Sequence, residues 1–235
     1  MDAASFLRHF RRELDAFGAC LANADLTAAI EHDEALTLAE LAALVGASNL
    51  FAAAAVTDWN GGDTPPDGTP PKVPEDHYEL TRWVEGTGDV LCMALDTEPE
   101  TPAWGFYTPP NAGHWQRSRA VTMMLNRWDA ERTAGEAGPL NAGLAAEGIS
   151  EVFDVLAPKQ IGRGKAWPPE ACVRLEATDT GEWWVFGPGE PVAEVTGTAG
   201  DLLLLLRGRR SPDDAVFTWS GDRGTALSVL KGPLA

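Results

Sequence analysis

Apolar residues recur with the spacing of an α-helix in five segments of the first two-thirds of the chain. In residues 3–24 the apolar positions mostly lie three or four residues apart, which brings them to one face of a helix. The same period recurs in residues 38–57, 77–96, 114–134 and 141–156. The pattern therefore predicts four long amphipathic helices followed by a shorter one.

Polar and helix-breaking residues separate these segments. Thr37 and Glu40 have the spacing of a capping box, in which the hydroxyl accepts from the Glu40 N–H and the carboxylate reaches back to the Thr37 N–H. Runs rich in Pro and Gly occupy 60–76, 108–113 and 135–140, and they predict surface loops. Long amphipathic helices joined by loops favour a four-helix bundle.

The hydrophobic period changes to two after Pro158, which is typical of strands. Strands are predicted within 172–179, 182–187, 190–197 and 216–222. The apolar run at 198–210 predicts a buried helix that covers the sheet, and 225–232 predicts a closing helix or strand. The chain is therefore predicted to be α+β, with a helical bundle at 1–158 and a small α/β domain at 159–235.

The composition indicates a globular protein with an acidic surface. The chain has 235 residues, of which 44% are apolar and 23% charged, and its formal net charge is −17. This charge argues against a nucleic-acid partner, because phosphates are bound mainly through Lys and Arg. Charged residues interrupt the N-terminal apolar stretch, and no run approaches the ~18 apolar residues of a membrane span. We therefore expect a cytoplasmic protein without a signal peptide or a membrane partner.

The cysteines and histidines show no spacing that would hold a metal. Cys20, Cys92 and Cys172 are far apart, and buried, reduced thiols explain them best. The four histidines lie outside any metal-ligand motif and are predicted to be surface residues. Motifs of a nucleophile elbow, a phosphate-binding loop and a dinucleotide-binding fold are missing from the sequence.

The fourth predicted helix carries the best candidates for chemistry. Ser118, Thr122, Asn126 and Asp129 follow one another at intervals of three or four residues beside its apolar face. In a bundle, such a flank can line an interior pocket that binds a small molecule. The structural alternative is that both hydroxyls bond carbonyl groups of their own helix and that the Asn126 amide caps a neighbouring helix.

Several runs resemble one known family. The strongest is NRWDAERTAGEAGPLNAGLAAEGISEVFDVLAP at 126–158, and LTLAELAALVGASNLFAAAAV at 36–56, GTAGDLLLLLRGR at 197–209 and WSGD at 219–222 follow the order of that family. Over nearly its whole length the sequence resembles the mycothiol-dependent maleylpyruvate isomerases and their actinobacterial relatives. The resemblance implies a DinB-like four-helix bundle, a small C-terminal α/β domain, and an isomerase that uses mycothiol and a divalent metal.

The positions that hold the metal in that family are altered in this sequence. By resemblance, Leu44 occupies the place of one histidine ligand, Thr122 that of a glutamate and Asn126 that of a second histidine, while Asn49 matches a further family histidine. Metal sites need imidazole, thiolate or carboxylate donors. We therefore expect no metal and no bound cofactor, and mycothiol is left as a candidate thiol without a metal to activate it.

Three functions stay open at this point. The first is a repurposed small-molecule enzyme of specialised metabolism, an isomerase, transferase or lyase, with Asn126, Thr122 and Arg127 as catalytic residues. The second is a non-catalytic ligand-binding or scaffold protein with a protein partner, and the third is thiol-dependent transfer without a metal. The expected ligand contacts are Ser118, Asn49, Leu44, Arg82 and Trp83, and Arg119 offers a further positive charge.

Overall fold

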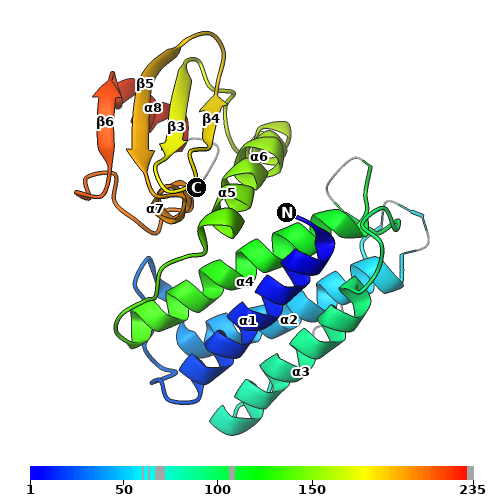
Figure 1. The fold of residues 1–235 in the computed structure, drawn as a ribbon. Helices are drawn as coiled ribbons and strands as arrows, with labels where there is room; N and C mark the ends of the chain where they lie inside the picture. Colours follow the sequence, from blue (N-terminus) through cyan, green and yellow to red (C-terminus); the bar gives the residue numbers. More distant parts are fainter. Residues whose placement is uncertain (60, 63, 67–71, 106–108, 232–235) are drawn as a thin grey trace. The chain divides into compact units, whose positions relative to one another are not determined.

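The computed structural model describes residues 1–59, 61–62, 64–66, 72–105 and 109–231. Its contacts divide the chain into two compact units, Met1–Leu140 and Asn141–Ala235, whose elements are labelled in Figure 1. Parts of the loops predicted at 60–76 and 108–113 lie outside the described residues, as does the end of the chain.

The first unit is a helical bundle with a small hairpin. Its elements are α1 (Ala3–Leu21), β1 (Ala29–Ile30), β2 (Asp33–Thr37), α2 (Leu38–Thr57), α3 (His77–Leu95) and α4 (Ala112–Ala134). Helix α1 packs against α4 and α3, and α2 packs against α3 and α4 (Figure 1). The predicted four-helix bundle is confirmed.

Each long helix of this unit begins at a polar residue whose side chain caps it. Asp2, Asp76 and Asn111 each accept a hydrogen bond from the backbone N–H three residues further on. At the start of α2, the Thr37 hydroxyl accepts from the Glu40 N–H at 3.3 Å, and the Glu40 carboxylate accepts from the Thr37 N–H at 2.8 Å. Both halves of the predicted capping box are present. Such caps satisfy N–H groups that have no partner within the helix.

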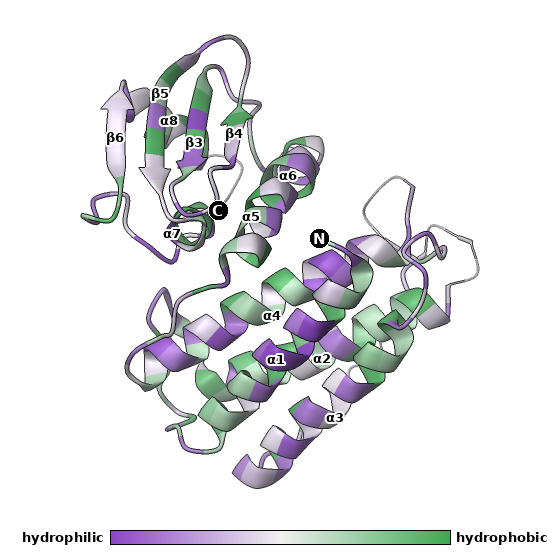
Figure 2. Ribbon diagram, viewed as in Figure 1, coloured by the Kyte–Doolittle hydropathy of each residue, from purple (hydrophilic) through white to green (hydrophobic). Residues whose placement is uncertain are grey.

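Large apolar side chains and one close helix approach build the core of the bundle. Phe10 and Phe17 of α1 are at most 1% exposed, while α1 also shows strongly hydrophilic turns in Figure 2. Gly46 of α2 lies against Trp83 of α3, and a Cβ added at Gly46 would meet the indole at 2.1 Å. The absence of a side chain at Gly46 therefore makes the space that Trp83 occupies.

The hairpin between α1 and α2 was not predicted from the sequence. β1 and β2 pair antiparallel, with Ala29 opposite Thr37 and Ile30 opposite Asp33. Only Ile30 is inserted into the core, at 1% exposure, and most of β2 is exposed. With a single buried apolar residue, the segment lacks the alternation by which a strand is recognised.

Helix α2 corrects one expectation about membranes. By length and composition alone it is apolar enough to cross a membrane, with a mean hydropathy of 1.6 over its most apolar window. The expectation that no segment approaches a membrane span is therefore wrong for this helix. In the bundle, Leu38, Val45 and Ala52 are at most 1% exposed. Burial in a protein core explains the same apolar composition.

The second unit begins earlier than the sequence indicated. Its elements are α5 (Ala142–Glu151), the π-helix η1 (Val152–Leu156), α6 (Ala157–Gly162), β3 (Cys172–Ala177), β4 (Trp183–Phe186), β5 (Pro191–Gly197), α7 (Ala199–Leu206), β6 (Thr218–Gly221) and α8 (Arg223–Lys231). The change of hydrophobic period suggested a boundary after Pro158, but the contacts divide the chain after Leu140. Helix α5 packs on α7, and this packing assigns it to the second unit.

The π-helix marks the place where the helical segment accommodates a proline. The Ala157 N–H bonds to the carbonyl of Val152, five residues back. The next residue, Pro158, has no N–H, and in a regular α-helix its ring would crowd the carbonyl of Asp154. The wider turn removes this conflict, so one helical stretch continues through Pro158 into α6.

The sheet has one covered face and one polar face. Its strand order is β4-β3-β5-β6, with β3 and β5 parallel and the other two pairs antiparallel. Val173, Leu175 and Val195 are fully buried, and both α7 and α8 contact β3 and β5. On the opposite face Arg174 pairs with Glu194 at 3.0 Å. Figure 2 shows the alternation of hydrophobic and hydrophilic positions along β3 and β5. The predicted α+β class is confirmed.

Candidate functional site

A row of polar side chains runs along α4 at the edge of its buried face. Residues four positions apart lie on neighbouring turns of one side of a helix. Ser118, Thr122 and Asn126 have this spacing and are half-buried, and we call them the α4 row. Val121 and Leu125, next to the row, are at most 2% exposed and pack into the bundle core. The helix therefore holds the row between core and surface.

The α4 row makes no side-chain hydrogen bond to any other residue that the structure describes. Elsewhere in the bundle, helical threonines do bond their own helix: Thr133 of α4 donates to the carbonyl of Asp129 at 2.8 Å. The structural alternative for the row, with hydroxyls bonded to their own helix and Asn126 as a cap, is therefore not found among the described residues. The two hydroxyls and the amide can bond a ligand or water instead.

Arg119 lies next to the row in the sequence and is buried against α2. It is 6% exposed, and its Nη2 donates to Ser48 Oγ at 3.0 Å and to Asn49 Oδ1 at 2.9 Å. Asn49 is fully buried, and its amide also approaches the hydroxyl of Thr87 on α3 at 3.5 Å. Asn49, predicted as a ligand contact, is thus engaged with Arg119 and Thr87. These bonds orient the guanidinium through neutral oxygens.

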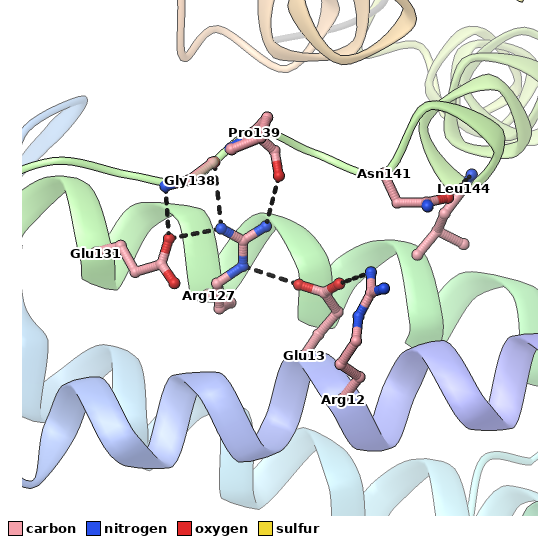
Figure 3. Close-up of polar contacts among 8 residues, drawn as sticks. All are labelled: Arg12, Glu13, Arg127, Glu131, Gly138, Pro139, Asn141 and Leu144. Atoms are coloured by element: carbon pink, nitrogen blue, oxygen red, sulfur yellow. Dashed lines mark hydrogen bonds and ion pairs between the residues drawn. The ribbon is translucent and has the colours of Figure 1, made fainter.

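Arg127, predicted to be catalytic, holds the bundle together instead (Figure 3). Its Nε donates to Glu13 of α1 at 2.8 Å and its Nη1 to Glu131 at 2.5 Å. The guanidinium also donates to the carbonyls of Gly138 and Pro139, which fixes the turn after α4. Burial lowers the pKa of Arg127, but the bonds to Glu131 and Glu13 outweigh this and raise that pKa above its ordinary value. We therefore correct its role to a structural one.

Two predicted ligand contacts, Leu44 and Arg82, are exposed, and the third, Trp83, packs between two helices. Leu44 is 56% exposed, so it does not line a buried pocket. Arg82 is exposed on α3, where it donates to the hydroxyl of Tyr78 at 3.2 Å. Trp83 packs its ring against Gly46 of α2. Periodicity could not reveal this, because the exposure of a helical residue depends on what packs opposite it.

The metal that the family resemblance implies does not fit the residues present. Among the described residues, no group of three or more His, Cys, Asp or Glu side chains is placed to hold a metal ion. Leu44 has no donor atom, and Thr122 and Asn126 offer only neutral groups, whereas zinc sites are built from imidazole, thiolate and carboxylate. His32 is exposed, as predicted, and it pairs with the buried Asp129 at 3.3 Å.

Two cavities are described, and the α4 row lines neither of them. One, of about 630 Å³, lies in the second unit between residues 165–171 and the first turns of α8. The other, of about 400 Å³, lies in the first unit and includes Cys20, which is half-buried, whereas Cys92 and Cys172 are buried as expected. Burial and the nearby Glu131 carboxylate raise the pKa of the Cys20 thiol, which disfavours its reactive thiolate form.

Comparison with known families assigns the second unit. Residues 143–228 match the family model described as the MDMPI C-terminal domain. The second unit is an MDMPI C-terminal domain. The match begins within α5, two residues after the start of the second unit at Asn141, and it extends through the sheet into α8. In the MDMPI C-terminal domain of this chain, α5 is therefore an integral part.

Comparison with solved structures assigns the fold of the whole chain. Two structures of a mycothiol-dependent maleylpyruvate isomerase, one of them a mutant, each align over 94% of this chain and 93% of their own. The TM-scores are 0.65 and 0.64, at 16% and 17% sequence identity. At such identities the likeness shows the fold, and the resemblance inferred from the sequence is confirmed at that level. No curated protein sequence matches the chain.

Proposed function

We propose that the bundle binds a small organic molecule through the α4 row, without a metal, and that it acts as a divergent small-molecule enzyme. One observation carries this proposal: Ser118, Thr122 and Asn126 make no side-chain hydrogen bond to any other described residue. Half-buried polar groups that have no partner within the protein bond water or a ligand. A ligand that accepts and donates hydrogen bonds would pair them.

The chemistry of the row limits the reactions it can support. Hydroxyl and amide groups are neutral near pH 7, so they are poor bases but good hydrogen-bond donors. Donors aimed at an oxygen on which negative charge develops can lower a reaction barrier. An isomerase, transferase or lyase reaction through an enolate-like or oxyanion state suits this row. The row also lacks a base that could deprotonate a thiol, so mycothiol supplies no step of this mechanism.

The second candidate is a ligand-binding or scaffold protein without catalysis. It is favoured by the loss of the metal-binding residue types at Leu44, Thr122 and Asn126, because a fold can be retained after its chemistry has gone. In this case a protein partner would read out the bound ligand. A cytoplasmic location and the absence of membrane and nucleic-acid partners belong to both proposals.

Metal content and ligand binding test the proposal together. We expect the untagged full chain to contain less than about one-tenth of an equivalent of zinc, iron or manganese by mass spectrometry, and EDTA to leave its melting temperature unchanged. A stoichiometric metal bound in the bundle would overturn the metal-free mechanism.

Ligand binding is tested with a metabolite library that includes mycothiol. Binding of each compound is measured as a shift in the melting temperature of the protein. We expect Thr122→Val and Asn126→Leu to weaken any hit by about tenfold, because each removes hydrogen bonds to the ligand. Thr133→Val is the control, since that hydroxyl bonds its own helix. Hits that are insensitive to both row variants would contradict a site on the α4 row.

A further inference from the structure

The cavity of about 630 Å³ lies wholly within the second unit, and the proposed function makes no use of it. The segment 165–171, which joins α6 to β3, forms one wall, and the first turns of α8 form the other. Its volume is in the range of small-molecule sites. Several lining residues are exposed, so the cavity opens to solvent. We call it the α8 groove.

Trp167 gives the α8 groove a stiff aromatic wall. It lines the groove and is 87% exposed, so its indole is available to a ligand. Pro168 and Pro169 follow, and each proline fixes its own φ and restricts the residue before it to extended conformations. Stacking a ligand ring on this indole therefore removes apolar surface from water and orders little of the chain.

Two charged side chains of opposite sign also line the groove. The side chains of Lys165 and Glu170 make no hydrogen bond or ion pair with any residue that the structure describes, including each other. Exposed Lys and Glu side chains are ordinarily solvated, so the two charges alone indicate no site. Beside an aromatic wall, they offer one place for a carboxylate and another for an ammonium group.

The hydroxyl groups of α8 add hydrogen-bond acceptors to the opposite wall. Thr225 donates its hydroxyl proton to Asp222 at 2.7 Å, and Ser228 donates to the carbonyl of Gly224 at 3.3 Å. A hydroxyl that has donated its proton can still accept a hydrogen bond from a ligand. This wall therefore favours an ammonium group over a second carboxylate.

The other charged residues near the groove leave this balance unchanged. Arg223, the first residue of α8, pairs with Asp213, and Asp222 accepts hydrogen bonds from the first turn of the same helix. Lys231 ends α8 and Arg163 follows α6, and neither of them lines the groove. The lining itself therefore carries one positive and one negative charge.

We propose that the α8 groove binds a zwitterionic aromatic molecule of the size of a free aromatic amino acid. The ring stacks on Trp167, Lys165 binds the carboxylate, and Glu170 with the hydroxyl oxygens of α8 binds the ammonium group. A ligand without net charge also suits a chain of net charge −17, which repels free anions at long range. The groove contains no residue of the α4 row, so the inference goes beyond the proposed function and does not depend on it.

Three fluorinated probes share one ring and differ only in charge. Para-fluorophenylalanine carries both charges, para-fluorophenylpropanoate lacks the ammonium group, and para-fluorophenethylamine lacks the carboxylate. We expect fluorine NMR titrations of the full chain to give at least about fivefold tighter binding of the amino acid than of either analogue, because each analogue loses hydrogen bonds to one charged side chain.

Variants of the lining residues assign each part of the ligand. Lys165→Gln should reduce the affinity for the amino acid to that for the amine, and Glu170→Gln should reduce it to that for the propanoate. Trp167→Ala should weaken all three probes by about tenfold, because all three share the ring. Glu182→Gln and Trp183→Ala are the controls, since both residues are exposed in the same unit and lie outside the groove.

Equal binding of the three probes, an analogue that binds as tightly as the amino acid, or binding unchanged in Trp167→Ala would each overturn the inference. Loss of binding in Thr122→Val and Asn126→Leu would also overturn it, because those residues belong to the α4 row. Metabolites whose binding is lost in Trp167→Ala are assigned to the groove, so the two sites are tested separately. If Trp167→Ala fails to fold, the preference of the wild-type chain and its dependence on Lys165 and Glu170 decide the matter.

Discussion

The guanidinium of Arg127 lies 2.8 Å from Glu13, and both side chains are at most 6% exposed. Removing Arg127 takes away the buried partner of Glu13 and leaves that carboxylate to Arg12, whose side chain is 60% exposed and lies 2.7 Å away. We expect Arg127→Met to lower the free energy of unfolding by about 3–5 kcal/mol, measured by urea denaturation. Arg132→Met, which breaks an exposed pair with Glu31, should cost less than about 1 kcal/mol. A folded Arg127→Met variant that loses ligand binding without losing stability would restore the catalytic role.

Gly46 and Gly86 predict opposite responses to the same substitution. A Cβ at Gly46 would lie 2.1 Å from the ring of Trp83, whereas a Cβ at Gly86 of α3 would meet nothing within 4 Å. Gly46→Ala should therefore destabilise the bundle by about 1–3 kcal/mol through overpacking. Gly86→Ala should stabilise it by about 0.5–1 kcal/mol, because alanine restricts the unfolded chain. Urea titrations compare the two, and a stable Gly46→Ala would mean that Trp83 is free to move.

Single residues also show which features of the site could be predicted from the sequence and which could not. The positions of Ser118, Thr122 and Asn126 at the edge of the core follow from helical spacing, and the structure agrees. Spacing could not show that Arg127 pairs with Glu13, because the two are 114 residues apart in the chain. It also could not show that Leu44 is exposed. Both facts depend on which helix packs opposite, and a local period carries no information about this.

At the scale of elements, the capping box predicts how the start of α2 responds to pH. Hydrogen bonds from the Thr37 N–H and hydroxyl lower the pKa of Glu40 below 4.5. A carboxylate whose pKa is depressed on folding adds stability above its unfolded pKa, and this stability is lost as the pH falls through the folded value. The free energy of unfolding of the wild type should therefore exceed that of Glu40→Ala near neutral pH, and this difference should disappear only below pH 4.5. Thr37→Ala should cost about 1 kcal/mol at pH 7. Urea titrations at several pH values measure the free energy of unfolding of the wild type and of both variants. A wild type that stays more stable than Glu40→Ala in strong acid would contradict the role of the capping box.

Elements with a strong period and a clear cap were predictable, and those set by tertiary packing were not. The starts of α2 and of β3 follow from Thr37 and from the alternation that begins at Cys172. The π-helix was not foreseen, because it reconciles Pro158 with a helix that the core already holds in place. The hairpin at 29–37 has one buried anchor, Ile30, and thus no local pattern.

At the scale of the molecule, the position of the boundary decides whether the MDMPI C-terminal domain can fold alone. Two contacts tie residues 141–158 to strand β4: Trp184 Nε1 donates to Ser150 Oγ at 2.9 Å, and the rings of Phe153 and Phe186 stack at 5.0 Å. Leu144 and Ile149 of α5 are fully buried in this unit. A fragment that starts after Pro158 loses these contacts and exposes the apolar surface of α7 on which α5 packs.

We therefore expect a fragment of residues 141–235 to unfold cooperatively and to give a dispersed NMR spectrum. The fragment 159–235, whose boundary follows the change of hydrophobic period, should aggregate or remain partly unfolded, because about 25 cal/mol is lost for each Å² of apolar surface left in water. Thermal unfolding followed by circular dichroism compares the two fragments. A Trp184→Phe variant of the longer fragment serves as the control, since it removes one hydrogen bond but keeps α5. Equal stability of both fragments would show that α5 is an appendage, and the first unit would then have to extend to Pro158.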